Sequence, residues 1–123
     1  MKRVNAQAAI LACLVVAAPT LNAEKAVSLR VTPHVAAAPA TVTIIVTVEP
    51  DEKNRALVVE DDSEAYYRSS QIQLEGKNAA RRHVFMFRGL PPGEHRVIAS
   101  VHRTDGFHAV DSTTVMVVGS SGL

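Results

Sequence analysis

The chain has 123 residues, a length that fits one small domain, and its 13 Lys and Arg residues nearly balance its 12 Asp and Glu residues, for a formal net charge of +1. A charge this small gives no electrostatic reason to expect nucleic acid or an anionic surface as a partner. A single cysteine excludes an internal disulfide framework.

The first 23 residues have the three parts of a bacterial-type signal peptide. Lys2 and Arg3 form a basic start, and residues 8–18 are an unbroken run of small and aliphatic side chains that a proline ends. The residues that follow suit cleavage after Ala23. A run of about 11 residues is too short to span a hydrocarbon core about 30 Å thick. We therefore expect removal of residues 1–23, export to the periplasm or the medium, and no membrane span in the processed protein.

Cys13 lies inside this apolar run, and we interpret it as an apolar residue rather than as a lipidation site. A bulky Leu11 stands where a lipidation motif favours a small residue, and apolar residues continue after the cysteine to Ala18. Processing would leave no cysteine, so the protein would depend on core packing alone. It would also leave 11 Lys and Arg residues against all 12 acids, because Lys2 and Arg3 are removed.

From Val27 onward, apolar residues alternate with polar ones at the period of two that a half-buried strand requires. The clearest example is residues 41–49, where four β-branched residues would share one face. Prolines, glycines and polar clusters separate these segments. In chain order, the expected strands are 27–32, 41–49, 55–60, 66–74, 82–88, 94–103 and 112–118.

Seven short strands predict an all-β fold, a single antiparallel sandwich of two sheets over residues 24–118, with a flexible tail at 119–123. Residues 36–39 are expected to be a connection of small residues, and residues 61–64 a loop. With no Trp, two Tyr and three Phe, valine and isoleucine must fill most of the core.

Residues 87–101, FRGLPPGEHRVIASV, resemble a corner between two strands of bacterial immunoglobulin-like sandwiches. Leu90, Pro92 and Gly93 match the pattern of that corner. His95 takes the place of the usual tyrosine, whose hydroxyl bonds to the backbone. The same string is also similar to the transthyretin-like regulatory domains attached to carboxypeptidases. The resemblance implies a seven-stranded immunoglobulin-like sandwich, in which a buried and bonded His95 ring would contribute about 1–2 kcal/mol.

Five histidines are the candidates for a metal site. None forms the His-x-His pattern that directs two imidazoles to one side of a strand. His102 and His108 flank the turn at Asp105, so they could meet across a hairpin with the Asp105 carboxylate nearby. We hold this as the hypothesis of a weak metal site, against the alternative of scattered surface histidines, and we assign no cofactor.

Tyr66, Tyr67 and Arg68 follow an acidic segment at residues 60–64. Adjacent residues of a strand face opposite sides, so we expect one tyrosine in the core and the other at the surface beside Arg68. An exposed tyrosine next to an arginine is typical of a protein-interaction surface, and it also suits stacking on a sugar. The acidic segment lacks the spacing of a calcium loop and is expected to be solvated.

No arrangement of residues indicates catalysis. Beyond residue 23 there is no cysteine, and no serine lies in a Gly-x-Ser-x-Gly setting. We therefore expect a non-enzymatic, exported interaction or structural module that binds a protein partner. The alternatives are a periplasmic small-ligand or metal-binding protein and a transthyretin-like regulatory or hydrolytic domain.

Overall fold

The structure is a computed structural model that describes residues 25–119. The expected signal peptide with its cleavage position at Ala23, and most of the expected tail, lie outside the described residues. Within residues 25–119, no helix has the length and apolarity needed to cross a membrane.

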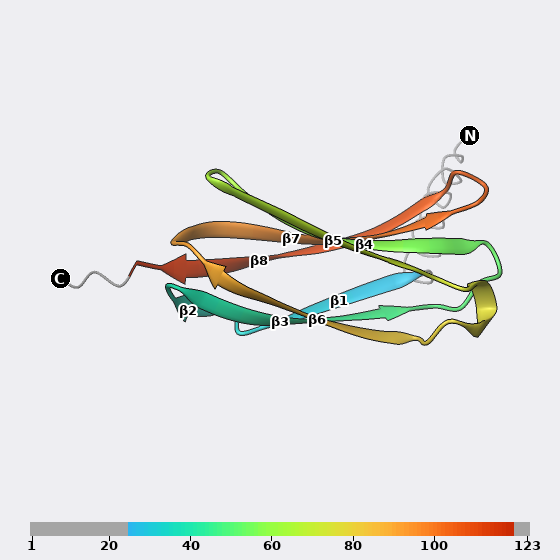
Figure 1. The fold of residues 1–123 in the computed structure, drawn as a ribbon, viewed down its shortest axis with the longest axis horizontal. Helices are drawn as coiled ribbons and strands as arrows, with labels where there is room; N and C mark the ends of the chain where they lie inside the picture. The colour runs from blue at the N-terminus through green and yellow to red at the C-terminus, as the bar shows by residue number, and fades with distance from the viewer. Residues whose placement is uncertain (1–24, 120–123) are drawn as a thin grey trace, which may run out of the picture.

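Two β-sheets pack face to face in the described part of the chain (Figure 1). Its strands are β1 (Val27–Thr32), β2 (Val35–Ala37), β3 (Ala40–Val48), β4 (Asn54–Ser63), β5 (Tyr66–Gln73), β6 (Arg82–Leu90), β7 (Gly93–Arg103) and β8 (His108–Val118). A single 3-10 turn, η2 (Gly76–Asn78), precedes β6. The smaller sheet has the strand order β1-β3-β6, and the larger has β2-β8-β7-β4-β5.

The core lies between the inner faces of the two sheets, as the period of two predicts. In β3, every second residue from Val42 to Val48 is buried, and in β7 every second residue from His95 to Val101 is buried. Valines make up most of the buried hydrophobic residues, and Phe87 is the largest fully buried side chain. The prediction of an all-β fold with two sheets is therefore confirmed.

The prediction of seven antiparallel strands is wrong. Residues 35–37, expected in part to be a connection, form the additional strand β2, and β2 pairs with β8 in parallel. Its three residues are too few to show a period. The strand β4 also continues to Ser63, through residues expected to be a loop, because the burial of Leu57 and Val59 on alternate positions extends to Asp61.

A hydrogen bond and two ion pairs connect the loop of the β7–β8 hairpin to the turn between β3 and β4. The backbone N–H of Thr104 donates to the carbonyl of Lys53 at 2.9 Å. The guanidinium of Arg103 pairs with the carboxylate of Asp51, and Lys53 Nζ lies 3.8 Å from Asp105 Oδ2. These contacts fix one end of the larger sheet, where both strands of the hairpin meet (Figure 1).

Candidate functional site

Two histidine rings are in contact on the outer face of the larger sheet. In β7 the odd-numbered residues, such as Val101, point into the core, so His102 points outward. The register pairs His102 with His108, the first residue of β8, and paired residues of antiparallel strands lie on the same face. The two ring centroids are 4.1 Å apart, and the ring planes are tilted by 47°.

The local hydrogen bonding explains why these rings lie so close together. The backbone N–H of Arg103 donates to the carbonyl of Phe107 at 3.2 Å. The next pair, His102 and His108, is therefore of the non-hydrogen-bonded kind, in which side chains stand closest. His108 is exposed and His102 is half-buried, so both are open to solvent. Two imidazoles in this arrangement are donors suited to Zn²⁺, Cu²⁺ or Ni²⁺.

Asp105, the third residue of the metal-site hypothesis, has other partners. Its Oδ1 accepts the backbone N–H of Phe107 at 2.9 Å, and its Oδ2 lies 3.8 Å from Lys53 Nζ. Among residues 25–119, no group of three or more His, Cys, Asp or Glu is placed to hold a metal ion. The structure thus brings His102 and His108 together and leaves them as a pair.

His95, the third residue of β7, is fully buried and uses both ring nitrogens. Its Nε2 lies 2.8 Å from the carbonyl oxygen of Pro91, and its Nδ1 lies 2.9 Å from Asp61 Oδ1. A carbonyl oxygen only accepts, so Nε2 carries a proton. Leu90 is buried at the start of the corner, Pro92 is exposed beside it, and Gly93 ends the corner at a φ of +135°. The two hydrogen bonds of His95 hold the turn between β6 and β7 in place.

Sequence reasoning missed Asp61, the partner of His95. Asp61 lies opposite Val97 in the pairing of β4 with β7, and its side chain is fully buried. Burial raises the pKa of this carboxyl, and its hydrogen bond with His95 opposes that effect. The signal that could have found it is the alternation of Leu57, Val59 and Asp61 in β4. Because neither side chain is exposed, the pair supports the fold and does not meet a ligand.

Tyr66, Tyr67 and Arg68 point to different sides of β5. Tyr66 packs against the core with its ring 5.8 Å from that of His95, whereas Tyr67 is exposed. The guanidinium of Arg68 lies 4.5 Å from the ring centroid of Phe87. Tyr67 and Arg68 therefore do not form one continuous surface patch.

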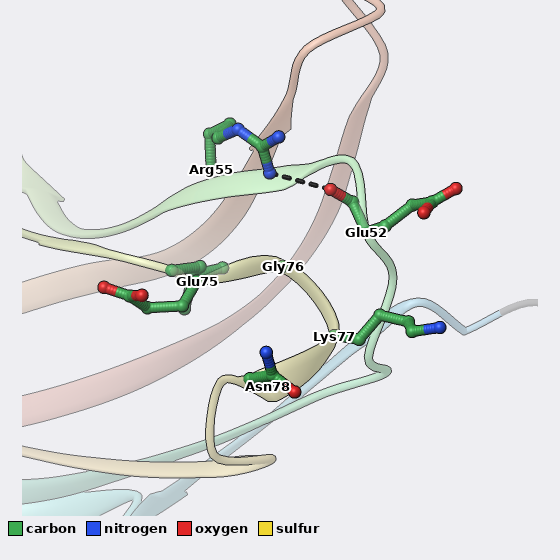
Figure 2. Close-up of a pocket in the computed structure, with 7 residues that line it drawn as sticks. Glu52, Arg55, Glu75, Gly76, Lys77 and Asn78 are labelled. Atoms are coloured by element: carbon green, nitrogen blue, oxygen red, sulfur yellow. Dashed lines mark hydrogen bonds between the residues drawn. The ribbon is translucent and has the colours of Figure 1, made fainter.

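A polar depression of about 500 Å³ lies between the β3–β4 turn and the segment that follows β5 (Figure 2). Arg55 donates to the carbonyl oxygen of Glu52 at 2.7 Å, and the carboxylates of Glu52 and Glu75 point to opposite sides. Gly76 has a φ of +62°, and a Cβ there would lie 3.3 Å from the Glu52 carbonyl oxygen. With Lys77 also present, acids and bases are mixed around the depression, so it selects no particular ligand charge.

No protein-family model and no curated protein sequence matches this chain. Among solved structures it is similar to the superoxide reductase (neelaredoxin) from Ignicoccus hospitalis, with a TM-score of 0.61 and 12% identity over 74% of this chain and 79% of that one. Two variants of that enzyme match with TM-scores of 0.59 and 0.61. The sporulation control protein Spo0M from Bacillus subtilis matches with a TM-score of 0.49 and 13% identity, over 75% of this chain and 48% of that one.

At 12% identity the similarity shows the fold alone, and that fold is the one of a superoxide reductase. The expected membership in the immunoglobulin-like or transthyretin-like domains is therefore wrong. The same finding overturns the expectation of a non-enzymatic, protein-binding module, because that expectation was drawn from the fold, and proteins with this fold include a redox enzyme.

A reductase needs a group that takes up and releases electrons, and cofactors or metals usually supply it. Residues 25–119 contain no cysteine and no cluster of three or more metal-binding side chains. The described residues therefore do not fit a resident metal with a full set of protein ligands. Among the described residues, the paired histidines of the β7–β8 hairpin are the best candidate for a metal-binding site.

Proposed function

We propose that this chain binds a divalent transition-metal ion, Zn²⁺ or Cu²⁺, through the imidazoles of His102 and His108. The observation that carries the proposal is the contact between the two rings, whose centroids are 4.1 Å apart on an open face. Each ring can direct one nitrogen at the same ion, because the register holds both residues at the same level of the hairpin. Copper stands highest in the affinity order of the divalent first-row ions, and imidazole is a usual ligand of both copper and zinc.

The surroundings of the pair also favour a bound ion. The hairpin end is held by the backbone bond from Thr104 to Lys53 and by the ion pair of Arg103 with Asp51, so the strands that carry the ligands have a fixed position. Positions around the ion that histidine does not occupy would hold water or an anion, as in open metal sites. The proposed location is the periplasm or the medium, because residues 1–23 have the pattern of a signal peptide.

Equilibrium dialysis of the full chain against Zn²⁺, and separately against Cu²⁺, tests the proposal. His102→Ala and His108→Ala should each weaken binding at least about tenfold, because the loss of even a residue that only supports a ligand costs about 10–100-fold. The matched control is His34→Ala. This exposed histidine precedes β2, which pairs with the opposite end of β8. Equal binding by all four proteins, or no binding by the wild type, would overturn the proposal.

A further inference from the structure

We infer that a second copy of this chain completes the metal site, so that one Zn²⁺ ion is bound by four imidazoles, His102 and His108 from each copy. The inference rests on the proposed function. Zinc in structural sites takes four ligands in a tetrahedral arrangement. The described residues supply two, since no third donor joins the pair in residues 25–119. A two-fold axis through the ion supplies the same two ligands again.

The outer face beside the histidines is uncharged. In the register of β4 with β7, Ala56 lies opposite His102, and Val58 lies opposite Ser100. On its other side, Ser100 lies opposite Val110 of β8. We call these four residues, together with the two histidines, the hairpin face. Two copies that meet through the hairpin face bring no like charges together.

Charged side chains begin further along the same face. Glu60 of β4 is the first, and its carboxylate accepts a hydrogen bond from Tyr67 at 2.5 Å. Asp62 and Arg96 lie opposite each other in the following row. An unrelated protein bound here could place charges of either sign against Glu60, Asp62 and Arg96. A second copy centred on the histidines would instead contact the uncharged residues of the hairpin face.

An exposed aliphatic side chain lies next to the ligands. Val110 is 58% exposed although it is two residues from His108 on the same face of β8. A second copy would remove this side chain from water. The hairpin face has only six residues, far fewer than the roughly 20–30 residues on each side of a stable interface. The metal ion must therefore supply most of the attraction, and the dimer should form only when zinc is present.

Sedimentation velocity and zinc dialysis on the full chain test this inference together. We expect one zinc ion for two chains and a doubling of the 13.2 kDa mass on addition of Zn²⁺, reversed by a chelator. Val110→Lys keeps both ligands but sets two like charges against each other across the interface, and lysine does not compete for zinc. This variant should bind one zinc ion per chain and stay monomeric. The matched control is Val84→Lys, because Val84 is 54% exposed on the smaller sheet.

The outcomes separate the two proposals. One zinc ion per wild-type chain without a change in mass overturns the shared site and leaves the proposed function in place. Absence of zinc binding overturns this inference, and absence of both zinc and copper binding overturns the proposed function as well. A dimer that forms without zinc, or that persists in Val110→Lys, also overturns the inference, since the contact would then lie elsewhere. Loss of the dimer in Val110→Lys and in His108→Ala, with the dimer retained in Val84→Lys, supports it.

Discussion

His95 and Asp61 form a hydrogen bond in the interior of the fold, where neither side chain is exposed. His95 Nε2 donates to the carbonyl of Pro91, and one proton lies in the hydrogen bond between Nδ1 and the Asp61 carboxylate. With that proton on either partner the pair has no net charge, which is the arrangement that burial favours. The pair thus joins β4 to the corner before β7.

We predict that His95→Ala lowers the free energy of unfolding by about 3–5 kcal/mol, the usual cost of removing one partner from a buried pair. This exceeds the value of about 1–2 kcal/mol that a single hydrogen bond of the ring would contribute. Urea denaturation measures the change. The control is His83→Ala, whose half-buried ring bonds to one carbonyl, that of Ala80. A similar small loss in both variants would contradict the role given to the pair.

Asp51 connects two elements, the β3–β4 turn and the β7–β8 hairpin. Its Oδ1 accepts the backbone N–H of Lys53 at 2.8 Å, and its other oxygen pairs with Arg103. The Lys53 N–H lowers the pKa of Asp51 below its ordinary value of 3.8, and the charge of Arg103 adds to that effect. The carboxylate therefore stabilises the hairpin end that carries His102.

The sign of this pKa shift fixes a pH dependence. A folded pKa below the unfolded one means that the stabilisation is present above pH 3.8 and is lost as the pH falls through the folded value. Asp51→Asn should therefore be less stable than the wild type at neutral pH, and the difference should vanish in strong acid. Urea midpoints of both proteins across this range provide the test. A difference that stays constant with pH would show that the charge of Asp51 does not contribute.

The period of two located most of the strands, because alternation along a strand is a local property. The strand β2 was not predicted from the sequence, because Val35–Ala37 is too short and too rich in alanine to show alternation. The end of β4 was not predicted either, because its acidic residues were interpreted as a solvated loop. Asp61 in fact continues the series of buried positions in that strand. Burial of a charged residue such as Asp61 can be predicted only when its partner is known, and that partner, His95, lies in another strand.

The histidines of the candidate site differ from this buried pair in sequence separation. His102 and His108 lie on either side of one turn, so a hairpin alone is enough to bring them face to face. Asp61 and His95 are 34 residues apart, and only the packing of β4 against β7 brings them together. The first contact can be inferred from a turn signal, whereas the second depends on the whole sheet.

The described part of the chain has a fold similar to that of superoxide reductase at 12% sequence identity, so the fold and the site must be considered separately. The two-sheet fold supplies a rigid frame with hairpin ends, and the residues on those ends decide what is bound. In this chain one hairpin end carries two histidines in contact, and the neighbouring rows of the outer face are uncharged. We therefore assign the proposed metal binding to the hairpin and not to the shared fold.

Electron paramagnetic resonance of the full chain loaded with Cu²⁺ tests the metal site most directly, because coupling to nitrogen nuclei identifies imidazole ligands. The account predicts nitrogen coupling in the wild type, its loss in the double variant His102→Ala/His108→Ala, and its retention in His34→Ala/His83→Ala. A spectrum that is the same in the wild type and in the first double variant would contradict the account.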